Sequence, residues 1–493
     1  MDLLLLLLAV SLVTLSLPLF FLILTYRAKS REDVVSKNHR LPPGRYGWPV
    51  VGETLEFLYG KPEKFVSERM RKYSSSVFKT NILGERVAVL CGPDGNKFIF
   101  SNEQKLFTEW RPHSMQKLMR SYEARASSQP PPPPNPSESK TKVLRQPGFL
   151  KPEALSRFMA QMDATARQQM ELYWEGRKEV AVFPLAKTFT LSLASHFFLG
   201  LADHQLGRIT RLAGEFDDVS VGLHCIPWKI PGTVFYRASK GASAIRKELL
   251  LIIKEKKAAL DRGEKTPDIL SFMILATDPG SGRFMPENEI ADKMMGLLTA
   301  GYNTVASAIT FLMKFVGEQP HIYHQILIEQ KTIAESKGTG EFLAWEDIQK
   351  MRYSWNVACE TLRLAPPLQG TFREALIDIS YGGFIIPKGW KVYWTVSTTN
   401  KDPKYFPNPE VFDPNRYGEG GSALPPYTYV PFGGGPRLCP GKEYARLAIM
   451  TFLHNVVRRF KWEVVDPTEE MIEDMIPTPS KGLPVRLIPQ AMQ

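Results

Sequence analysis

The chain has 493 residues, of which 43% are hydrophobic, so it holds ample apolar material for a large packed core. Its net charge of +11 is scattered along the sequence without a basic arm or stripe. This argues against nucleic-acid binding and favours contact with anionic lipid or an acidic protein partner. The four cysteines show no C-x-x-C spacing, which argues against a disulfide framework or a zinc site and favours a reducing compartment.

Residues 3–24 form a run of mostly apolar, uncharged residues that is long enough to cross a bilayer as a helix. A cleaved signal peptide is the alternative, but such a peptide has a basic start, a shorter apolar core and a small-residue cleavage site. We therefore predict a transmembrane signal-anchor over residues 1–26. Because Arg27, Lys29 and Arg31 follow it, the positive-inside rule places the rest of the chain in the cytosol.

Residues 27–44 are predicted to be a basic linker that ends in the proline-rich hinge Leu41-Pro42-Pro43-Gly44. Adjacent prolines force an extended, stiff segment, which would hold the following domain at a fixed angle to the anchor. An ordinary cluster of turns fits the same spacing. No break in composition divides residues 45–493, so we predict one large domain there.

Helical periodicity dominates the middle of that domain. Apolar spacing and flanking prolines or glycines predict four helices, at Ala244–Arg262, 287–316, Tyr353–Leu364 and Gly441–Phe460. Strands are fewer, and are predicted at Val87–Cys91 and Lys391–Thr395, with a short hairpin over Ile377–Ile386. The sequence therefore predicts a mainly α chain with a small β part.

Two further segments differ from their surroundings. Ser127–Ser139 is a polyproline segment of low complexity, which predicts a solvated, extended loop. Leu223–Phe235 is apolar and broken by two prolines. It fits either part of the core or a second contact with the membrane.

One cysteine lies in a glycine-rich loop, PFGGGPRLCPG over residues 431–441, directly before the predicted C-terminal helix. A thiolate metal ligand needs an ionised sulfur, and the start of a helix favours that charge because free N–H groups point toward it. A buried structural cysteine beside a glycine turn is the alternative. The residues that surround Cys439 favour the metal ligand.

These surrounding residues fit a flat ligand that carries carboxylates. Glycines let the backbone approach such a ligand closely, Arg437 can pair with one of its carboxylates, and the ring of Phe432 can pack under it. The glycines concerned are Gly433, Gly434, Gly435 and Gly441.

The spacing F-x-x-G-x-R-x-C-x-G over residues 432–441 resembles the haem-binding signature of the cytochrome P450 superfamily at every defining position. The resemblance implies the cytochrome P450 fold, mainly α with a small β domain, over residues 45–493. It also implies haem b with Cys439 as the iron's proximal ligand. Electrons would come from NADPH through NADPH-cytochrome P450 reductase.

Glu360 and Arg363 form an E-x-x-R motif on one face of a predicted helix, where they can pair. By itself this spacing also fits a surface ion pair. The resemblance implies that both residues join Arg416, from the segment FDPNRY, in a buried structural network behind the cysteine loop. Such a network would fix the geometry of the loop.

Ala300-Gly301-Tyr302-Asn303-Thr304 lies in the middle of the long predicted helix. Glycine costs about 1 kcal/mol there relative to alanine, so Gly301 needs a reason. Close helix packing is one. The resemblance implies another, a groove for dioxygen formed by Ala300 and Gly301, with Thr304 serving oxygen activation. Asn303 stands where the family usually carries an acid, and an amide can orient a water molecule but cannot ionise.

Arg373 follows the E-x-x-R helix in the segment GTFR. The resemblance implies that it holds a haem propionate, whereas an ordinary surface arginine is the alternative. The W-x-x-x-R pattern that the family usually carries is absent around Trp110 and Lys117.

The resemblance covers nearly the whole chain and looks closest to the plant beta-amyrin 28-oxidase group, on segments such as Leu41–Phe57, Cys91–Asn102 and Tyr353–Glu374. It implies a single-pass protein of the endoplasmic reticulum membrane with a cytosolic catalytic domain. The reaction would be oxidation of a bulky hydrophobic terpenoid, such as the C-28 methyl of beta-amyrin. A taxane or diterpenoid hydroxylase, a non-redox haem-thiolate isomerase and an inactive haem binder are the alternatives.

Overall fold

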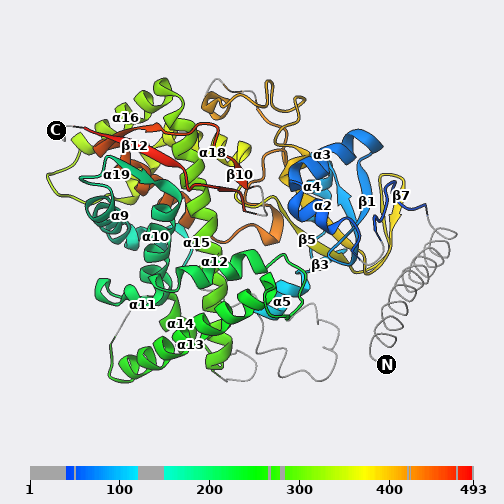
Figure 1. The fold of residues 1–493 in the computed structure, drawn as a ribbon, viewed down its shortest axis with the longest axis horizontal. Helices are drawn as coiled ribbons and strands as arrows, with labels where there is room; N and C mark the ends of the chain where they lie inside the picture. Colours follow the sequence, from blue (N-terminus) through cyan, green and yellow to red (C-terminus); the bar gives the residue numbers. More distant parts are fainter. Residues whose placement is uncertain are drawn as a thin grey trace, which may run out of the picture. The chain divides into compact units, whose positions relative to one another are not determined.

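The computed structural model describes residues 40–48, 51–119, 149–264, 268–277, 284–418, 421, 423–472 and 476–490. The predicted anchor, most of the linker and the polyproline segment lie outside these described residues. The described chain forms two compact units (Figure 1). One unit contains the described residues up to Arg111 together with Gly370–Thr399, and the other contains those of Pro112–Gln369 and Asn400–Gln493.

The first unit is built on a five-stranded sheet in the order β1-β2-β8-β5-β3. β2 and β8 are parallel, and the other neighbours are antiparallel. The strands are β1 Val77–Ile82, β2 Glu85–Leu90, β3 Phe107–Glu109, β5 Gly370–Ala375 and β8 Lys391–Thr395, with a hairpin of β6 Ile379–Tyr381 and β7 Phe384–Ile386. The helices are α2 Thr54–Tyr59, α3 Pro62–Tyr73 and α4 Gly92–Ser101. The strand predicted at Lys391–Thr395 and the predicted hairpin are both confirmed.

The second unit is mainly helical, with small sheets near the C-terminus. Its helices are α5 His113–Met119, α8 Pro152–Leu155, α9 Met159–Tyr173, α10 Val182–Ala194, α11 Gly207–Thr210, α12 Ala213–Gly222, α13 Val234–Asp261, α14 Ile269–Leu275, α15 Glu287–Gly317, α16 Pro320–Glu335, α17 Trp345–Lys350, α18 Arg352–Leu364 and α19 Lys442–Arg459. Its strands are β4 Glu179–Ala181, β9 Phe460–Val464, β10 Met471–Ile472, β11 Thr478–Pro479 and β12 Pro484–Pro489.

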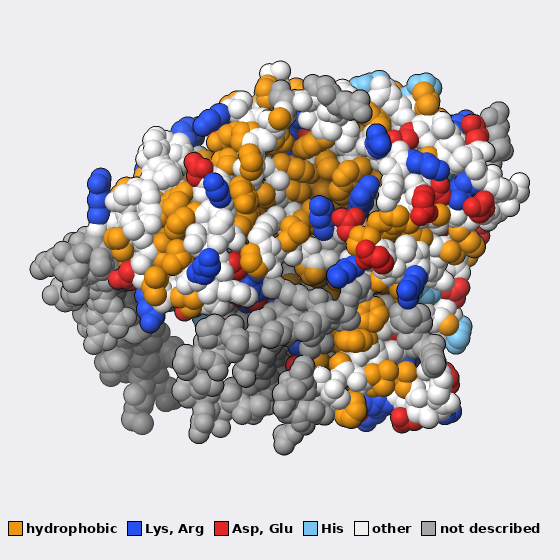
Figure 2. All heavy atoms as spheres, turned by 180° about the vertical axis from the view of Figure 1, so that it is seen from behind, with side chains coloured by type: hydrophobic (Ala, Val, Ile, Leu, Met, Phe, Trp, Pro, Cys, Tyr) orange, Lys and Arg blue, Asp and Glu red, His pale blue; other side chains and the backbone are white. Residues whose placement is uncertain are grey.

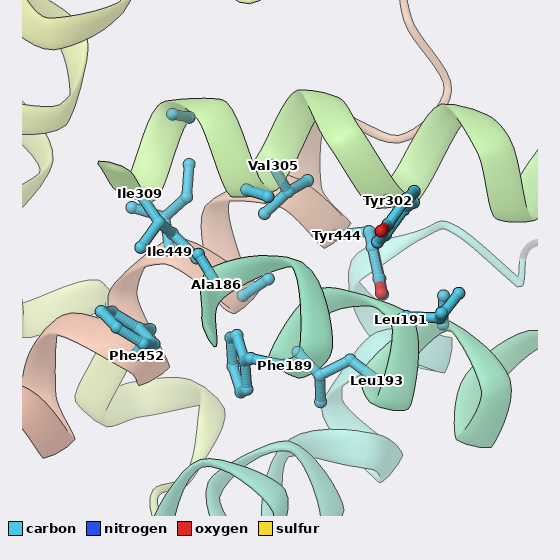
Figure 3. Packing of buried hydrophobic residues seen from close by; sticks show 14 of the residues in the cluster. Ala186, Phe189, Leu191, Leu193, Tyr302, Val305, Ile309, Tyr444, Ile449 and Phe452 are labelled. Carbon is cyan, nitrogen blue, oxygen red and sulfur yellow. The ribbon is translucent and has the colours of Figure 1, made fainter. Parts of the chain in front are cut away.

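The core of this unit forms where α10, α15 and α19 pack together. Figure 3 shows Phe189 of α10, Val305 and Ile309 of α15, and Ile449 and Phe452 of α19 turned toward one another. All five side chains are buried. Since apolar residues recur on more than one side of α15, this helix contacts several neighbours at once.

α15 confirms the long helix predicted at 287–316. It starts after Pro286, and Glu287 and Glu289 in its first turn favour the positive end of the helix dipole. Two described helical segments, Val182–Leu199 and Glu287–Gly317, are apolar and long enough to cross a membrane. Each buries 72% of its apolar window inside the protein, as core helices do.

α13 begins ten residues earlier than predicted. The hydroxyl of Thr233 caps its start by accepting a hydrogen bond from the backbone N–H of Tyr236 (3.2 Å). The helix ends before Gly263, which has a positive φ of 87° and stops it as predicted.

The segment Leu223–Phe235 was interpreted as either part of the core or a second membrane contact, and the interpretation as core is wrong for its middle part. Cys225 and Phe235 are buried, but Trp228 and Ile230 are 59% and 58% exposed. The loop is held by the Thr233 hydroxyl, which donates to the carbonyl oxygens of Trp228 and Ile230. Figure 2 shows apolar side chains gathered on one face of the molecule, with lysines and arginines scattered among them.

Candidate functional site

The cysteine loop is folded by its own backbone. Cys439 donates its N–H to the carbonyl of Phe432 (2.9 Å), and Gly433 donates to Val430 (2.9 Å). Gly433 and Gly435 have positive φ values of 71° and 63°, a conformation that residues with a side chain rarely adopt. The two glycines therefore allow the tight turns that bring the start of the loop beside its cysteine.

Cys439 is exposed, whereas Cys91, Cys225 and Cys359 are buried. Burial raises the pKa of Cys91 to about 12 and that of Cys225 and Cys359 to about 11, so these three thiols are unreactive. The surrounding protein also raises the pKa of Cys439, and a hydrogen bond from the Gly441 backbone opposes this. The Gly441 N–H thus favours the thiolate, but less than desolvation disfavours it. The further stabilisation of the negative charge would have to come from a bound metal ion.

The other residues predicted to contact the ligand come shortly before or after Cys439 in the sequence, and several of them are half-buried. Arg437 ends a short 3-10 helix, Gly435–Arg437, and is half-buried. Phe432 is half-buried and packs against the hydrophobic core. Gly441 precedes the first residue of α19, and a Cβ there would lie 3.8 Å from the Cys439 sulfur.

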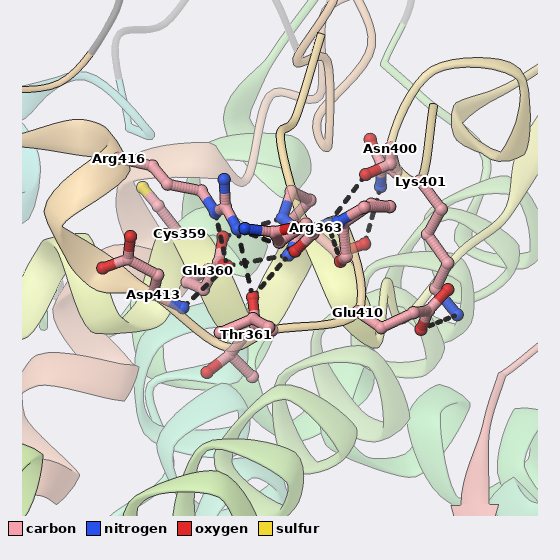
Figure 4. A network of polar contacts seen from close by, with 12 residues as sticks. Cys359, Glu360, Thr361, Arg363, Asn400, Lys401, Glu410, Asp413 and Arg416 are labelled. Atoms are coloured by element: carbon pink, nitrogen blue, oxygen red, sulfur yellow. Dashed lines mark hydrogen bonds and ion pairs between the residues drawn. The ribbon is translucent and has the colours of Figure 1, made fainter. Parts of the chain in front are cut away.

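Glu360, Arg363 and Arg416 form the predicted buried network (Figure 4). Arg363 donates from Nε and Nη2 to the two carboxylate oxygens of Glu360 at 2.8 and 2.7 Å. Arg416 donates from Nε to the same carboxylate at 3.2 Å, and the backbone N–H of Asp413 donates to it at 3.0 Å. The side chains of Glu360 and Arg363 are 0% exposed, so water does not compete for these bonds.

The remaining donors of the network hold the backbone after α18. Arg363 Nη1 donates to the carbonyls of Asn400 and Pro409 at 2.8 and 2.7 Å. The amide of Asn400 returns a hydrogen bond to the carbonyl of Arg363 (2.9 Å), and Tyr429, close to the cysteine loop, donates its hydroxyl to the carbonyl of Cys359 (2.8 Å). Sequence reasoning missed Asn400 and Tyr429, because neither belongs to a motif.

One face of α15 is open although the helix lies in the core. Ala300 is exposed and Thr304 half-buried, and the Thr304 hydroxyl donates to the carbonyl of Ala300 at 2.6 Å. Leu297 is also half-buried and lies on this face. The open face therefore carries a small residue, a hydroxyl and an aliphatic side chain.

Gly301 lies on another face of the same helix. It is buried, and a Cβ added to it would lie 3.3 Å from the ring of Phe198 and 3.6 Å from the ring of Tyr444. The structure thus favours close packing as the reason for this glycine. The dioxygen groove stays a prediction, and of its predicted residues Ala300 and Thr304 lie on the open side.

Asn303 turns away from the open face and is 7% exposed. Its amide Nδ2 donates to the hydroxyl of Ser220 on α12 at 2.8 Å, while its buried Oδ1 has no hydrogen-bond partner among the described residues. A buried acceptor without a partner is costly unless water satisfies it. That this amide orients a water molecule stays a prediction.

Arg373 lies on β5, in the first unit. Its Nε donates to both carboxylate oxygens of Glu103 at 2.8 and 3.0 Å, and its Nη1 donates to the Thr371 hydroxyl at 2.9 Å. Arg373 is 5% exposed, so it is not an ordinary surface arginine. Its role toward a propionate stays a prediction.

The donor set fits a haem. An exposed cysteine sulfur suits iron, and a half-buried arginine two residues away suits a carboxylate. The open face of α15 belongs to the same unit as the cysteine loop, and α15 packs against α19, which follows that loop. No described group of three or more His, Cys, Asp or Glu residues offers another metal site.

Comparison with known proteins agrees with this geometry. The family model described as cytochrome P450 matches residues 214–486. A Solanum lycopersicum protein named beta-amyrin 28-monooxygenase is 50% identical over 490 residues, 98% of each chain. Another protein from that plant, named beta-amyrin 6-beta-monooxygenase, is 46% identical over 461 residues, 92% of this chain and 94% of its own. This chain belongs to the cytochrome P450 family.

A solved structure shows the same fold. The retinoic acid-bound cyanobacterial CYP120A1 superposes with a TM-score of 0.80 and is 31% identical, with 92% of this chain and 100% of that chain covered. The predicted fold, mainly α with small sheets, is therefore confirmed. Members of the P450 family use haem b and electrons from NADPH, and this P450 is an oxidoreductase of the monooxygenase class.

The buried network gives a first test. Glu360→Ala leaves Arg363 and Arg416 without their carboxylate, which costs about 3–5 kcal/mol. We expect this variant to lose haem incorporation, measured as haem absorbance per protein in the purified chain. Glu410→Ala is the control, because the side chain of Glu410 is 75% exposed and its ion pair with Lys401 is long at 3.8 Å. Normal haem content in Glu360→Ala would contradict the structural role.

The cysteine ligand gives a second test. Cys439→Ser replaces the thiol by a hydroxyl, which is a poor donor to iron at neutral pH. The reduced carbonyl complex of this variant should lack the absorption band of thiolate ligation, whereas Cys225→Ser should keep it. Persistence of that band in Cys439→Ser would eliminate Cys439 as the ligand.

Proposed function

We propose that this P450 oxidises a pentacyclic triterpene such as beta-amyrin at its C-28 methyl group, using dioxygen and NADPH. The observation that carries the proposal is 50% identity over 98% of both chains to a protein named beta-amyrin 28-monooxygenase. Repeated turnover at one methyl would give an alcohol, an aldehyde and an acid. The relative named beta-amyrin 6-beta-monooxygenase is 46% identical, almost as similar as the first. The identities therefore support the triterpene substrate more strongly than the choice of C-28.

The residues of the site have separate tasks in this proposal. Cys439 holds the iron, Arg437 pairs with a propionate, and Phe432 packs beside the ring, while Gly433, Gly435 and Gly441 keep the backbone close. The bound haem supplies oxygen activation and insertion of one oxygen atom into a C–H bond, and the other oxygen leaves as water. The Thr304 hydroxyl lies on the open face of α15 and donates its proton to the carbonyl of Ala300, so it would have to turn away from that carbonyl to donate toward the site.

Proton supply to Thr304 would differ from that in relatives with an acid beside the threonine. Asn303 cannot ionise, and its Nδ2 is held by Ser220. Its Oδ1 can accept a hydrogen bond from a buried water molecule, but Asn303 turns away from the open face, so the proton for Thr304 would come from elsewhere. The amide therefore acts as a holder of water rather than as a proton donor.

The electron donor in this proposal is NADPH-cytochrome P450 reductase, docked beside the cysteine loop. Lys442 and Arg446 lie in the first turns of α19, directly after the loop. Arg446 also lies over the ring of Trp355, 5.3 Å from its centroid. Basic groups here would attract an acidic partner surface and make docking sensitive to salt.

Membrane attachment in this proposal uses the anchor over residues 1–26, with the catalytic domain in the cytosol at the endoplasmic reticulum. The exposed Trp228 and Ile230, with Lys229 between them, offer a second contact. An aromatic ring, an aliphatic chain and a lysine suit the boundary between lipid headgroups and acyl chains.

Two of the alternative functions lack support from the site. A haem-thiolate isomerase or an inactive haem binder does not need a hydroxyl on the open helix face, yet Thr304 is there. A diterpenoid or taxane hydroxylase would use the same residues with a different substrate. Only product analysis separates that alternative from the triterpene oxidase.

The proposed reaction is tested by co-expression in yeast with a plant P450 reductase and a beta-amyrin synthase. Mass spectrometry should find beta-amyrin with a new hydroxyl, aldehyde or carboxyl group, and fragmentation should place it on C-28. Cys439→Ser is the matched control and should give no product. An intact thiolate carbonyl spectrum without any oxidised triterpene would refute the substrate class and turn the search to diterpenes.

The second membrane contact is tested by fractionation. Deleting residues 2–25 should release only part of the protein, because Trp228 and Ile230 still bind lipid. Adding Trp228→Ser and Ile230→Ser to the deletion should release most of the remainder. Leu275→Ser is the control, since Leu275 is equally exposed at 59% but lies on α14. Complete release by the deletion alone would rule out the second contact.

A further inference from the structure

Two consecutive phenylalanines at the end of α10 share one aromatic partner. Phe197 and Phe198 lie in a five-residue π-helix, Ser195–Leu199, which directly follows α10. Their ring centroids are 5.5 and 5.4 Å from the centroid of Tyr444 on α19. Neighbouring side chains of an ordinary α-helix point in different directions and do not face the same partner. The extra residue in a π-helical turn explains how both rings reach Tyr444.

The rings of Phe198 and Tyr444 also meet α15, and they meet it at a glycine. A Cβ added to Gly301 would lie 3.3 Å from the ring of Phe198 and 3.6 Å from the ring of Tyr444. Figure 3 shows Tyr444 beside α15. Phe198 and Tyr444 are each 3% exposed, so neither ring has open space into which it could move. Phe198 therefore contacts α15 at Gly301 and α19 at Tyr444 at the same time.

Hydrogen bonds hold the π-helix on both sides of the two phenylalanines. The hydroxyl of Ser195 donates to the carbonyl of Leu191, and Nδ1 of His196 donates to the carbonyl of Leu201, both at 2.7 Å. Gly200 ends the π-helix with a positive φ of 63°. The backbone that carries the two rings is thus fixed by its own contacts, independently of α15 and α19.

Both contact points lie close to residues of the proposed site. Gly301 comes three residues before Thr304, about 4.5 Å along the helix. Tyr444 lies in the first turn of α19, five residues after Cys439. The distance between α15 and α19 is therefore set by these rings next to the turn that carries Thr304 and the loop that carries Cys439.

We propose that Phe198 is a positioning residue of the haem site, which sets the spacing between the Thr304 turn of α15 and the Cys439 loop. The inference rests on the proposed roles of Cys439 and Thr304, and it does not depend on the substrate. A large ring at 198 and the missing side chain at Gly301 form a complementary pair of sizes. A smaller side chain at 198 leaves the two helices without a fixed separation, so the iron is held less uniformly by its sulfur.

The test exchanges the two sizes in the full-length haem protein, with Phe198→Leu, Gly301→Ala and the double variant. Phe158→Leu is the matched control. The ring of Phe158 belongs to the same cluster, 4.6 Å from that of Phe197, but among the described residues it has no ring contact with Tyr444. Three quantities are measured: the midpoint reduction potential of the haem iron, the share of the reduced carbonyl complex that shows the thiolate band, and the unfolding midpoint.

We expect both Phe198→Leu and Phe158→Leu to lower the unfolding midpoint, because each removes part of an aromatic contact. Only Phe198→Leu should also shift the reduction potential and lower the share of the thiolate band. Gly301→Ala should do the same, since its methyl meets a ring that is packed on its other sides. In the double variant the leucine makes room for the methyl, so both quantities should return toward the wild type.

Two results would overturn the inference. One is a Phe198→Leu variant whose potential and thiolate share change no more than those of Phe158→Leu, which would leave the ring a purely structural role. The other is a double variant whose two effects simply add, because residues that share one space must compensate. If Phe198→Leu does not fold, Phe198→Met keeps more of the volume and takes its place in the same comparison.

Failure of the proposed site is distinguished by Cys439→Ser. If that variant keeps the thiolate band, the assignment of the ligand is wrong, and the positioning role of Phe198 is wrong with it. If Cys439→Ser loses the band while Phe198→Leu behaves like Phe158→Leu, the ligand stands and only the positioning role is overturned.

Discussion

The carboxylate of Glu360 is the point on which the geometry of the site depends. It accepts hydrogen bonds from two arginines and one backbone N–H in a place that water does not reach. Glu360 and Arg363 are fully buried and Arg416 is 12% exposed, so removing one partner would leave a charge that is largely buried and unpaired. The network therefore has one arrangement, and the segments that supply its partners are fixed with it.

This fixed arrangement extends to the cysteine loop. Arg363 holds the carbonyls of Asn400 and Pro409, and Arg416 belongs to the segment that continues toward residue 429. Tyr429 then donates back to the carbonyl of Cys359, the residue before Glu360. The chain thus leaves α18, returns to it, and enters the loop of Cys439 from a defined place.

The faces of the long helix α15 differ: the buried faces pack against the rest of the unit, and the open face carries residues predicted to serve the reaction. The buried faces carry Gly301, packed under Phe198 and Tyr444, and Asn303, bonded to Ser220. The open face carries Ala300 and Thr304. Because the helix is anchored by its buried faces, the hydroxyl and the small residues of the open face keep their positions without direct support.

The sequence by itself predicted the family and the long helix, which are confirmed, and it predicted Cys439 as the ligand. These features depend on local chemistry: turn glycines, helix periodicity, flanking prolines and the spacing of one cysteine and one arginine. The E-x-x-R pair was visible as a motif, but its burial was implied only by resemblance. Spacing alone fits an exposed pair as well as a buried one.

Only the tertiary structure decided which face of α15 each residue occupies and what it meets there. Gly301 and Gly296 are alike in the sequence, two glycines five residues apart in one helix. One contacts two aromatic rings, and the other contacts no described atom. The rings of Phe198 and Tyr444 are about a hundred residues or more away in the chain, and no local pattern brings them to Gly301. The partners of Asn303 and Arg363 were hidden for the same reason, since non-local contacts are fixed by packing and not by sequence spacing.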